Sequence, residues 1–279
     1  MEILLGGISS LFFGIGDFLG GEGAKRAPAA SIVLWSGVIS SPLIAAVALV
    51  ARGTPTPSDF ILGALAGVAG SIGLVVLFAG LARGQAAAVA PIAAAIGAVV
   101  PIVTAVIGGE RLSALVWAGV LIAIPAIMLS AWVVEPGDLP GGGFLYGVVA
   151  GLGFGSFTAI IASTSPDSNL LPLISARVAS MVLIVLVGLV GLWRVTGFGG
   201  VPRRIVVASG LLDVSANISL LIALRAGSLA LAAVAASFYP AVTVLMARIV
   251  NEEHLHVRQA AGLALTLVAL VAIAFGEVA

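Results

Sequence analysis

Asp213 and Asn217 are the residues of this chain whose types and spacing most clearly suggest chemistry. They lie four residues apart, so a helix would carry both side chains on one face. At about 1.5 Å per residue, Asp213 is about 15 Å from Arg203 and about 18 Å from Arg225, near the middle of an apolar segment. A carboxylate at that depth is unfavourable unless it meets a cavity, a partner or a proton. We therefore expect the pair to bind substrate or a coupling ion; a purely structural hydrogen bond is the alternative.

Asp17 and Arg177 are two further charged residues inside apolar segments. Asp17 lies about 7.5 Å of helix from Glu22, at the end of its segment, where it could line the mouth of a cavity or be solvated among lipid headgroups. Arg177 stands about 9 Å into its helix. Its guanidinium could bind a substrate carboxylate through two hydrogen bonds, or it could extend to the membrane interface. Both interpretations stay open for both residues.

Tyr239 precedes Pro240 within another apolar segment. A proline in the middle of a helix leaves a backbone carbonyl without its usual donor, and a substrate, water or ion can use that carbonyl. A kink that serves packing alone is the favoured alternative. We keep Tyr239 as a candidate for lining a site.

The chain that must position these residues is too apolar for a water-soluble surface. Of its 279 residues, 61% are hydrophobic and 9% are charged, whereas soluble domains carry about 25% charged residues. The mean hydropathy is +1.26, so the surface must face lipid. Basic and acidic residues number 12 each, which leaves no basic patch for nucleic acid. Cysteine is absent, which excludes disulfides and thiolate metal sites.

Ten apolar segments of about 20 residues, the length of a membrane-spanning helix, account for almost the whole chain. Turn residues separate them, and no connection is long enough to fold as a domain. The first segment lacks the positively charged start of a signal peptide, so we expect it to be retained as a helix. The expected helices cover residues 3–19, 30–50, 60–81, 86–107, 114–133, 144–163, 171–193, 205–224, 229–250 and 257–275.

The two halves of the chain resemble each other. Glu110 pairs with Glu253 at a shift of 143 residues, and Gly14 pairs with Gly155 at a shift of 141. Gly14 and Gly155 each end a stripe of small residues at four-residue spacing, which allows helices to approach closely in lipid. Five helices per half is an odd number, so the second half must enter the membrane from the opposite side. We expect an all-α membrane protein of ten transmembrane helices in two inverted five-helix repeats, residues 1–134 and 143–279, joined by a linker at 135–142.

Aligning the two halves distinguishes residues that occur in both from residues that occur in only one. Asp213 corresponds to Gly70 and Asn217 to Leu74, so the shared architecture does not need this pair. Asp17 corresponds to Thr158 in the same way. Trp35 lies opposite Arg177 in this register, and we include it among the candidate site residues.

The sequence contains few features that indicate metal binding or catalysis. The chain has no His-Glu-x-x-His, Gly-x-Ser-x-Gly or Gly-x-x-x-x-Gly-Lys-Ser/Thr motif, and Lys25 is its only lysine. Both histidines, His254 and His256, fall in one turn beside two glutamates, which raises the question of a metal site. The equivalent turn of the first half, residues 110–113, has no histidine, so we expect a solvated turn. We expect no metal, no cofactor and no enzymatic activity.

The order of these motifs resembles the drug/metabolite transporter superfamily, in particular its ten-helix EamA-type members. The first half carries Leu81-Ala82-Arg83-Gly84, a proline-containing helix and Gly109-Glu110-Arg111-Leu112-Ser113, and similar motifs recur in the second half at residues 223–227, 239–243 and 252–256. The second turn reads Glu253-His254-Leu255-His256, which departs from the family's usual Glu-Arg-Leu-Ser. The resemblance implies ten helices around a central cavity, and export or exchange of small metabolites.

These features together predict a secondary active transporter, an exporter of a small metabolite such as an amino acid, working by alternating access with protons as coupling ion. Arg177 and the acids Asp17 and Asp213 would together hold a zwitterion. An efflux pump for cationic drugs is the alternative within transport. An intramembrane enzyme is less favoured, and a channel is disfavoured because inverted repeats are typical of alternating access. The expected partners are a small-molecule substrate and the lipid bilayer.

The distribution of basic residues and the resemblance to EamA-type transporters predict opposite orientations of the chain in the membrane. Four arginines fall on the side of the chain ends and eight basic residues on the other, so the positive-inside rule places the ends outside. The resemblance implies cytoplasmic ends. The imbalance comes mainly from the second half, whereas the first half usually dominates insertion. We therefore expect a bacterial inner-membrane protein with cytoplasmic termini.

Overall fold

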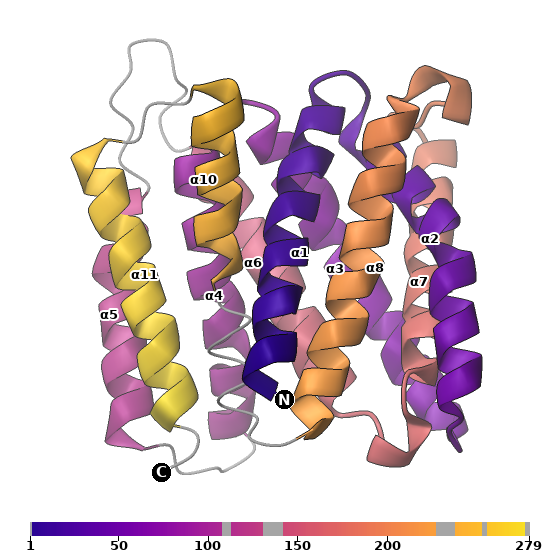
Figure 1. The fold of residues 1–279 in the computed structure, drawn as a ribbon, viewed down its shortest axis with the longest axis horizontal. Helices are drawn as coiled ribbons and strands as arrows, with labels where there is room; N and C mark the ends of the chain where they lie inside the picture. The colour runs from indigo at the N-terminus through magenta and orange to yellow at the C-terminus, as the bar shows by residue number, and fades with distance from the viewer. Residues whose placement is uncertain (1, 108–112, 131–141, 227–237, 253–255, 277–279) are drawn as a thin grey trace.

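The computed structural model describes residues 2–107, 113–130, 142–226, 238–252 and 256–276, and the regular structure in these ranges is entirely helical (Figure 1). Two short 3-10 turns, η1 (Pro166–Ser168) and η2 (Phe198–Gly200), lie in connections. The α-helices of the described ranges are α1 (Glu2–Ala24), α2 (Ala29–Ala51), α3 (Pro57–Leu81), α4 (Ala86–Ile107), α5 (Ala114–Ser130), α6 (Gly142–Ala162), α7 (Leu171–Leu189), α8 (Arg203–Ala226), α10 (Tyr239–Asn251) and α11 (Val257–Gly276).

Six stretches of the described residues are long and apolar enough to cross a membrane. They are Leu4–Ala24, Ala29–Ala51, Pro57–Leu81, Gly143–Ala162, Leu171–Leu189 and Arg203–Ala223. Shorter apolar stretches follow in α4, α5 and α11. A bundle of such helices hydrogen-bonds its backbone internally, as the bilayer interior requires. The chain is therefore a multi-pass integral membrane protein, as its composition predicts.

Helix boundaries differ from the sequence prediction in a few places. α1 continues past residue 19 to Ala24. α7 ends at Leu189, before the predicted Trp193, and Gly191 with a φ of +76° turns the chain toward η2. The predicted ninth helix, residues 229–250, is described only from residue 238, and residues 227–237 lie outside the described ranges. Tyr239 begins α10 with Pro240 in its first turn, where a missing N–H is tolerated, so the predicted mid-helix proline is not found in the described part.

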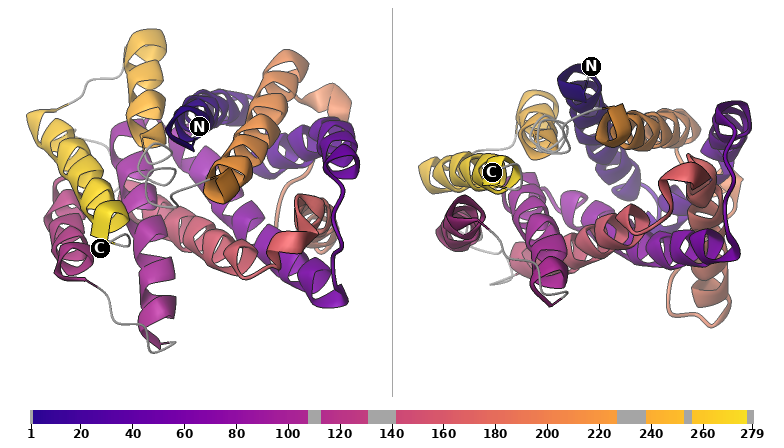
Figure 2. Two further views of the ribbon diagram at one scale, coloured as in Figure 1. Left: turned by 60° about the horizontal axis from the view of Figure 1, so that its bottom comes forward. Right: turned by 90° about the horizontal axis from the view of Figure 1, so that it is seen from below.

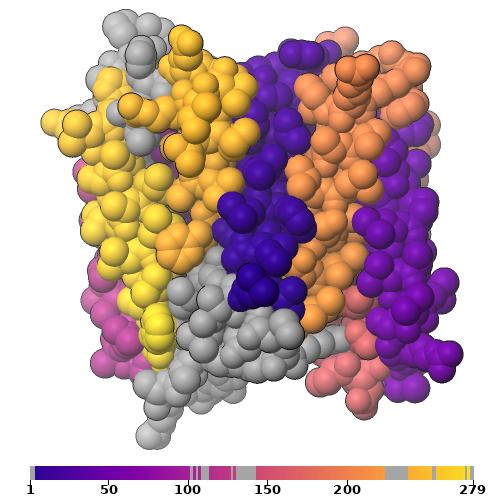
Figure 3. Space-filling model, in the orientation of Figure 1, coloured from indigo at the N-terminus to yellow at the C-terminus, as the bar shows by residue number. Residues whose placement is uncertain are grey.

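The core of the bundle forms between helices from opposite halves of the chain. α1 packs against α8 and α10, and α6 packs against α3 and α4. α2 contacts α8, α7 contacts α3, and α2 and α7 contact each other. α5 and α11 pair at one edge of the bundle in Figure 2, and α1 lies between α8 and α10 on the face shown in Figure 3. Most pairings of one half with the other thus have a reciprocal counterpart, whereas α4 also contacts α11 and α5 has no comparable contact with α10 within the described ranges.

Glycines allow the closest of these contacts. A Cβ atom at Gly14 would lie 2.8 Å from the carbonyl oxygen of Tyr239 on α10. A Cβ atom at Gly155 would lie 2.7 Å from the carbonyl oxygen of Gly97 on α4. Both distances are shorter than van der Waals contact, so these helices approach through their small faces. The close packing predicted for Gly14 and Gly155 is confirmed.

α1 begins and α11 ends at the same end of the bundle, the lower end in Figure 1. An even number of membrane crossings explains this arrangement. Reporter tags fused at Met1 and at Ala279 are therefore expected in the same compartment, as measured by protease protection or by compartment-specific fluorescence. Tags in opposite compartments would rule out an even number of spans.

Candidate substrate cavity

A cavity of about 500 Å³ lies among the helices. Every described helix except α5 contributes to its wall. Its volume falls within the range of about 300–1,000 Å³ that is usual for sites of small organic ligands. The charged and polar residues on its wall are Asp17, Ser71, Thr158, Arg177, Ser180, Asp213, Asn217 and Tyr239.

The cavity extends toward the end of the bundle where α1 begins. Its wall includes residues 157–159 and 162 in the last turns of α6 and residues 173, 176 and 177 in the first turns of α7. Figure 1 places the connection between these two helices at that end of the bundle.

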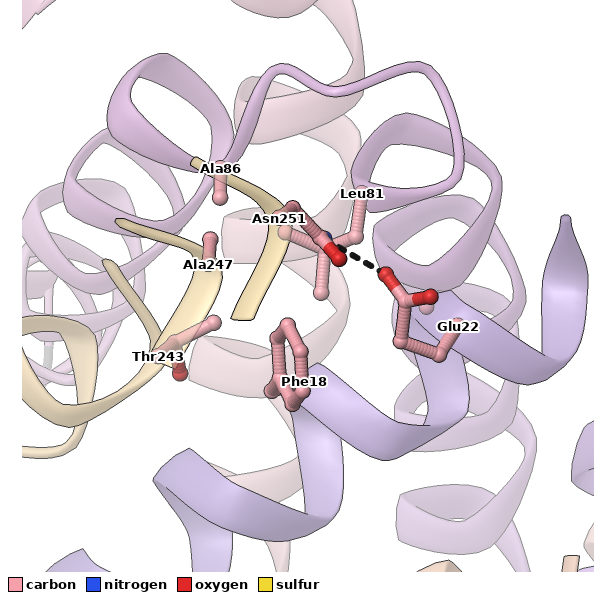
Figure 4. A pocket seen from close by; sticks show the side chains of 8 residues that line it. Phe18, Glu22, Leu81, Ala86, Thr243, Ala247 and Asn251 are labelled. Atoms are coloured by element: carbon pink, nitrogen blue, oxygen red, sulfur yellow. Dashed lines mark hydrogen bonds between the residues drawn. The ribbon is translucent and has the colours of Figure 1, made fainter. Parts of the chain in front are cut away.

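Side chains of α1 and α10 pack tightly toward the opposite end. A gap of only about 10 Å³ remains there, and Figure 4 shows Phe18 of α1 pointing into it beside Thr243 and Ala247 of α10. Asn251 Nδ2 donates a hydrogen bond of 2.6 Å to Glu22 Oε1, and Lys25 Nζ lies 2.6 Å from the same oxygen. We call Phe18, Glu22, Ala247 and Asn251 the seal. The seal joins the end of α1 to the end of α10.

Arg177 of α7 and Asp213 of α8 form an ion pair on the cavity wall. The distance from Arg177 Nη2 to Asp213 Oδ2 is 2.6 Å, and the side chains are 13% and 20% exposed. Asn217 Nδ2 donates to Asp213 Oδ1 at 3.3 Å and to the carbonyl oxygen of Asp213 at 2.8 Å. The hydrogen bond and the place on a cavity wall, which the sequence left as alternatives, occur together. Arg177 turns inward to Asp213 and does not extend to the membrane interface.

Asp17 reaches the same cavity from α1 and is only 8% exposed. No hydrogen bond or ion pair to its carboxylate is found within the described ranges. Asp213 and Tyr239 are close enough to interact with it electrostatically. Asp17 therefore lies on the cavity wall as a buried side chain, one residue before Phe18 of the seal.

Tyr239 and Trp35 have different surroundings. Tyr239 lines the cavity, and its ring meets that of Phe13 edge-on at 6.3 Å between centroids. Trp35 is not on the described cavity wall. Its Nε1 donates a hydrogen bond of 2.9 Å to the carbonyl oxygen of Thr196, and its ring lies 5.3 Å from that of Phe198. Trp35 thus anchors the connection between α7 and α8, and we leave it out of the site proposed below.

The cavity has a charged wall and a largely apolar wall. Asp17, Arg177 and Asp213 come from α1, α7 and α8, whereas α3, α4 and α6 supply mainly small, aliphatic and aromatic side chains. The apolar wall includes Gly70, Leu74, Ala94, Gly97, Phe154 and Phe157. A site with these two walls suits a molecule with one polar end and one apolar end.

Residues that the sequence analysis did not propose also line the cavity, and the repeat register could have found two of them. Thr158 is the counterpart of Asp17, and Gly70 is the counterpart of Asp213. Both counterparts line the cavity opposite the acids. Phe154 and Phe157 are apolar residues of an apolar helix, and no feature of the sequence distinguishes them from residues that face lipid.

Metal ligands are not clustered in the part of the chain that the structure covers. No group of three or more His, Asp or Glu side chains there could hold a metal ion. Of the two histidines in the predicted solvated turn, His254 lies outside the described residues. The backbone N–H of His256 donates to Gln259 Oε1 at 3.2 Å, at the start of α11.

A multi-pass helical bundle around a cavity with charged residues fits a membrane transport protein. Residues 1–132, slightly less than half of the chain, match the EamA-like transporter family, which is part of the drug/metabolite transporter superfamily. A solved crystal structure of a protein aligns with 99% of this chain and 97% of its own chain, with a TM-score of 0.64 and 17% sequence identity. That likeness shows the fold alone. A comparison with curated proteins gives no match.

Proposed function

We propose that this chain is a secondary active transporter that exports a small metabolite by alternating access, in exchange for protons. The observation that carries the proposal is a cavity of about 500 Å³ whose wall extends toward the end of the bundle where α1 begins, with the tightly packed seal at the opposite end. A fixed pore would need a continuous path. A cavity with one closed end instead supports a cycle in which the two ends open in turn.

The reciprocal helix pairings support two inverted repeats, residues 1–134 and 143–279, as the framework of this cycle. α1 packs on α8 and α10 as α6 packs on α3 and α4. If the halves are equivalent, the α1–α10 contact at the seal has its counterpart in the α6–α4 contact. Alternating access would then separate one contact while the other closes. The termini would be cytoplasmic, in a bacterial inner membrane.

The charged wall supports a substrate with an amino group, such as an amino acid, as the sequence predicts. Asp17 and Asp213 provide carboxylates for an ammonium group, and the guanidinium of Arg177 can bind a carboxylate if it leaves Asp213. The aromatic residues of the opposite wall would contact an apolar part of the substrate. A cationic drug is the second candidate, because the acids outnumber the arginine on this wall.

Counterflow in proteoliposomes tests the proposed function. Vesicles are loaded in turn with amino acids, amines, nucleosides and cationic dyes, and uptake of the radiolabelled compound is followed with and without a pH gradient. We expect at least one class to show counterflow that responds to the pH gradient and is saturable. Uptake that is linear in concentration and unaffected by internal substrate would indicate a pore and contradict the proposal.

A further inference from the structure

α2 and α7 are joined at the end of the bundle where α1 begins. The backbone N–H of Thr54 donates to the carbonyl oxygen of Asp167 at 2.9 Å, which links the α2–α3 connection to the α6–α7 connection. Asn169 Nδ2 donates to the carbonyl oxygens of Ala51 and Arg52 at 3.0 Å and 3.2 Å. The last turn of α2 is thereby bound to the residues that lead into α7.

Asp59 adds a buried link at the same end. Its carboxyl oxygens accept hydrogen bonds of 2.7 Å from the backbone N–H groups of Ser165 and Thr56, and the residue is 2% exposed. One side chain of α3 thus holds both connections. Carboxylates accept stronger hydrogen bonds than neutral groups, so separating the two connections here is unfavourable.

The same two helices are joined at the opposite end as well. The backbone N–H of Thr196, in the α7–α8 connection, donates to Ser31 Oγ at 2.8 Å, and the two hydroxyl oxygens lie 3.3 Å apart. Trp35 Nε1 donates to the carbonyl oxygen of Thr196 at 2.9 Å. Ser31 and Trp35 belong to the first two turns of α2. The start of α2 is therefore bound to the residues that follow α7.

Between these two ends, α2 and α7 touch directly, at the edge of the bundle opposite α5 and α11 (Figure 1). A Cβ atom at Gly37 would lie 3.5 Å from both Arg177 Cδ and Met181 Cγ, which is ordinary van der Waals contact. The stem of Arg177 thus lies against α2, while its guanidinium reaches Asp213 at 2.6 Å. The contact between α2 and α7 therefore supports a polar group of the cavity wall.

These links restrict how the two halves of the chain can move, because α2 belongs to the first half and α7 to the second. Rocking the halves as rigid bodies, about an axis in the membrane plane, would part α2 from α7 first at one end and then at the other. Each cycle would then break the hydrogen bonds at both ends in turn. The seal is linked less extensively: Asn251 donates a side-chain hydrogen bond to Glu22 beside a gap of about 10 Å³.

We propose that α2 and α7 stay joined at both ends throughout the transport cycle and form a fixed frame. This inference rests on the proposed function and specifies the movement behind it. One end of the cavity opens by local movement of α1 against α10 and the other by local movement of α6 against α4, without rocking of whole halves. Because Arg177 lies on the frame, its guanidinium keeps its place on the cavity wall while either end opens.

Reversible cross-linking distinguishes a fixed frame from rocking, and the chain has no cysteine of its own to interfere. One pair across α2 and α7 replaces the two hydroxyl side chains that lie 3.3 Å apart, and the other replaces two exposed residues joined through their backbones. A third pair bridges the seal as the matched control. The three variants are Ser31→Cys/Thr196→Cys, Thr54→Cys/Asp167→Cys and Glu22→Cys/Asn251→Cys.

Each pair is closed in proteoliposomes with a short bis-methanethiosulfonate reagent, and counterflow of phenylalanine is measured before and after reduction. Counterflow should stay within about twofold of the reduced protein when either α2–α7 pair is closed. It should fall at least about tenfold when the seal pair is closed, and reduction should restore it. Rocking has to open each end in turn, so closing either α2–α7 pair would arrest a rocking transporter.

Spin labels at the same three pairs give a readout that needs no transport. Dipolar broadening of the electron paramagnetic resonance spectrum in lipid reports the separation within each pair, with and without phenylalanine and at acidic and alkaline pH. Broadening at both α2–α7 pairs should be the same in all conditions, whereas broadening at the seal pair should change. The exposed pair at positions 54 and 167 decides the result if the pair at positions 31 and 196 does not fold.

The fixed frame is overturned if closing either α2–α7 pair reversibly arrests counterflow, or if the labels of that pair separate when those of the seal do. Alternating access would survive this result as a rocking of the two halves. If the closed seal pair leaves counterflow intact, or if no pair of labels changes in any condition, alternating access itself is contradicted and the frame falls with it.

Discussion

Replacing Gly14 by leucine is expected to prevent assembly of the folded bundle, because α1 could no longer pack against α10. Gly155→Leu should have the same effect on the contact between α6 and α4. A Cβ atom at Gly14 would collide with Val242 and with the backbone carbonyl of Tyr239, and one at Gly155 would lie 2.6 Å from Val100 Cβ. Overpacking of a core usually destabilises by about 1–3 kcal/mol, and contact with backbone places these changes at about 3 kcal/mol or more. The yield of monodisperse protein in size-exclusion chromatography, together with the melting temperature in detergent, measures the effect.

Gly7 of the same helix provides the matched control. A Cβ atom there would meet nothing within 4 Å. Gly7→Leu should therefore retain wild-type yield and melting temperature, although it adds the same side chain to α1. Normal folding of Gly14→Leu would show that α1 does not approach α10 as described.

The second large effect is expected from breaking the ion pair between Arg177 and Asp213. Because the pair is partly buried, breaking it should lower the free energy of unfolding by about 2 kcal/mol. That value lies between about 0–1 kcal/mol for exposed ion pairs and about 3–5 kcal/mol for buried ones. Arg177→Gln and Asp213→Asn should each lower both the melting temperature and the rate of counterflow, because each leaves one charge without its partner. Initial rates in proteoliposomes with matched protein content give the measurement.

The double variant is the control for this prediction. Arg177→Gln/Asp213→Asn leaves neither charge unpaired, so its melting temperature should exceed that of either single variant. If the effects of the two single substitutions simply add in the double variant, the two residues do not act as a pair, and the prediction is wrong. Unchanged counterflow in Asp213→Asn would remove this residue from the proposed mechanism.

The sequence predicted the helices well because each needs a continuous apolar stretch, and it predicted the charged cavity residues because ionisable groups are rare at such depth. Arg177 and Asp213 were both singled out, but they are 36 residues apart in the chain and lie on different helices. Nothing in either helix alone specifies that contact. The unpaired state of Asp17 is a consequence of the same pairing and could not be predicted without it.

Trp35 shows where the repeat register misleads. The register set it opposite Arg177, yet its side chain binds the connection between α7 and α8, residues 190–202. The corresponding connection of the first half, residues 52–56, is much shorter. Most of residues 190–202 have no counterpart in the first half. Contacts made by this segment therefore cannot be inferred by comparing the two halves.

Thiol labelling from each side of the membrane is the most direct test of alternating access, since the chain has no cysteine of its own. Thr158→Cys places a thiol on the cavity wall, and Ala86→Cys places one beside the closed gap, where residue 86 is 3% exposed. We expect an impermeant maleimide to label position 158 only from the side of the chain ends. A pH gradient that drives exchange should slow that labelling and expose position 86 to the opposite side. Labelling of position 158 from both sides at once, or transport while position 86 stays inert, would contradict alternating access around this cavity.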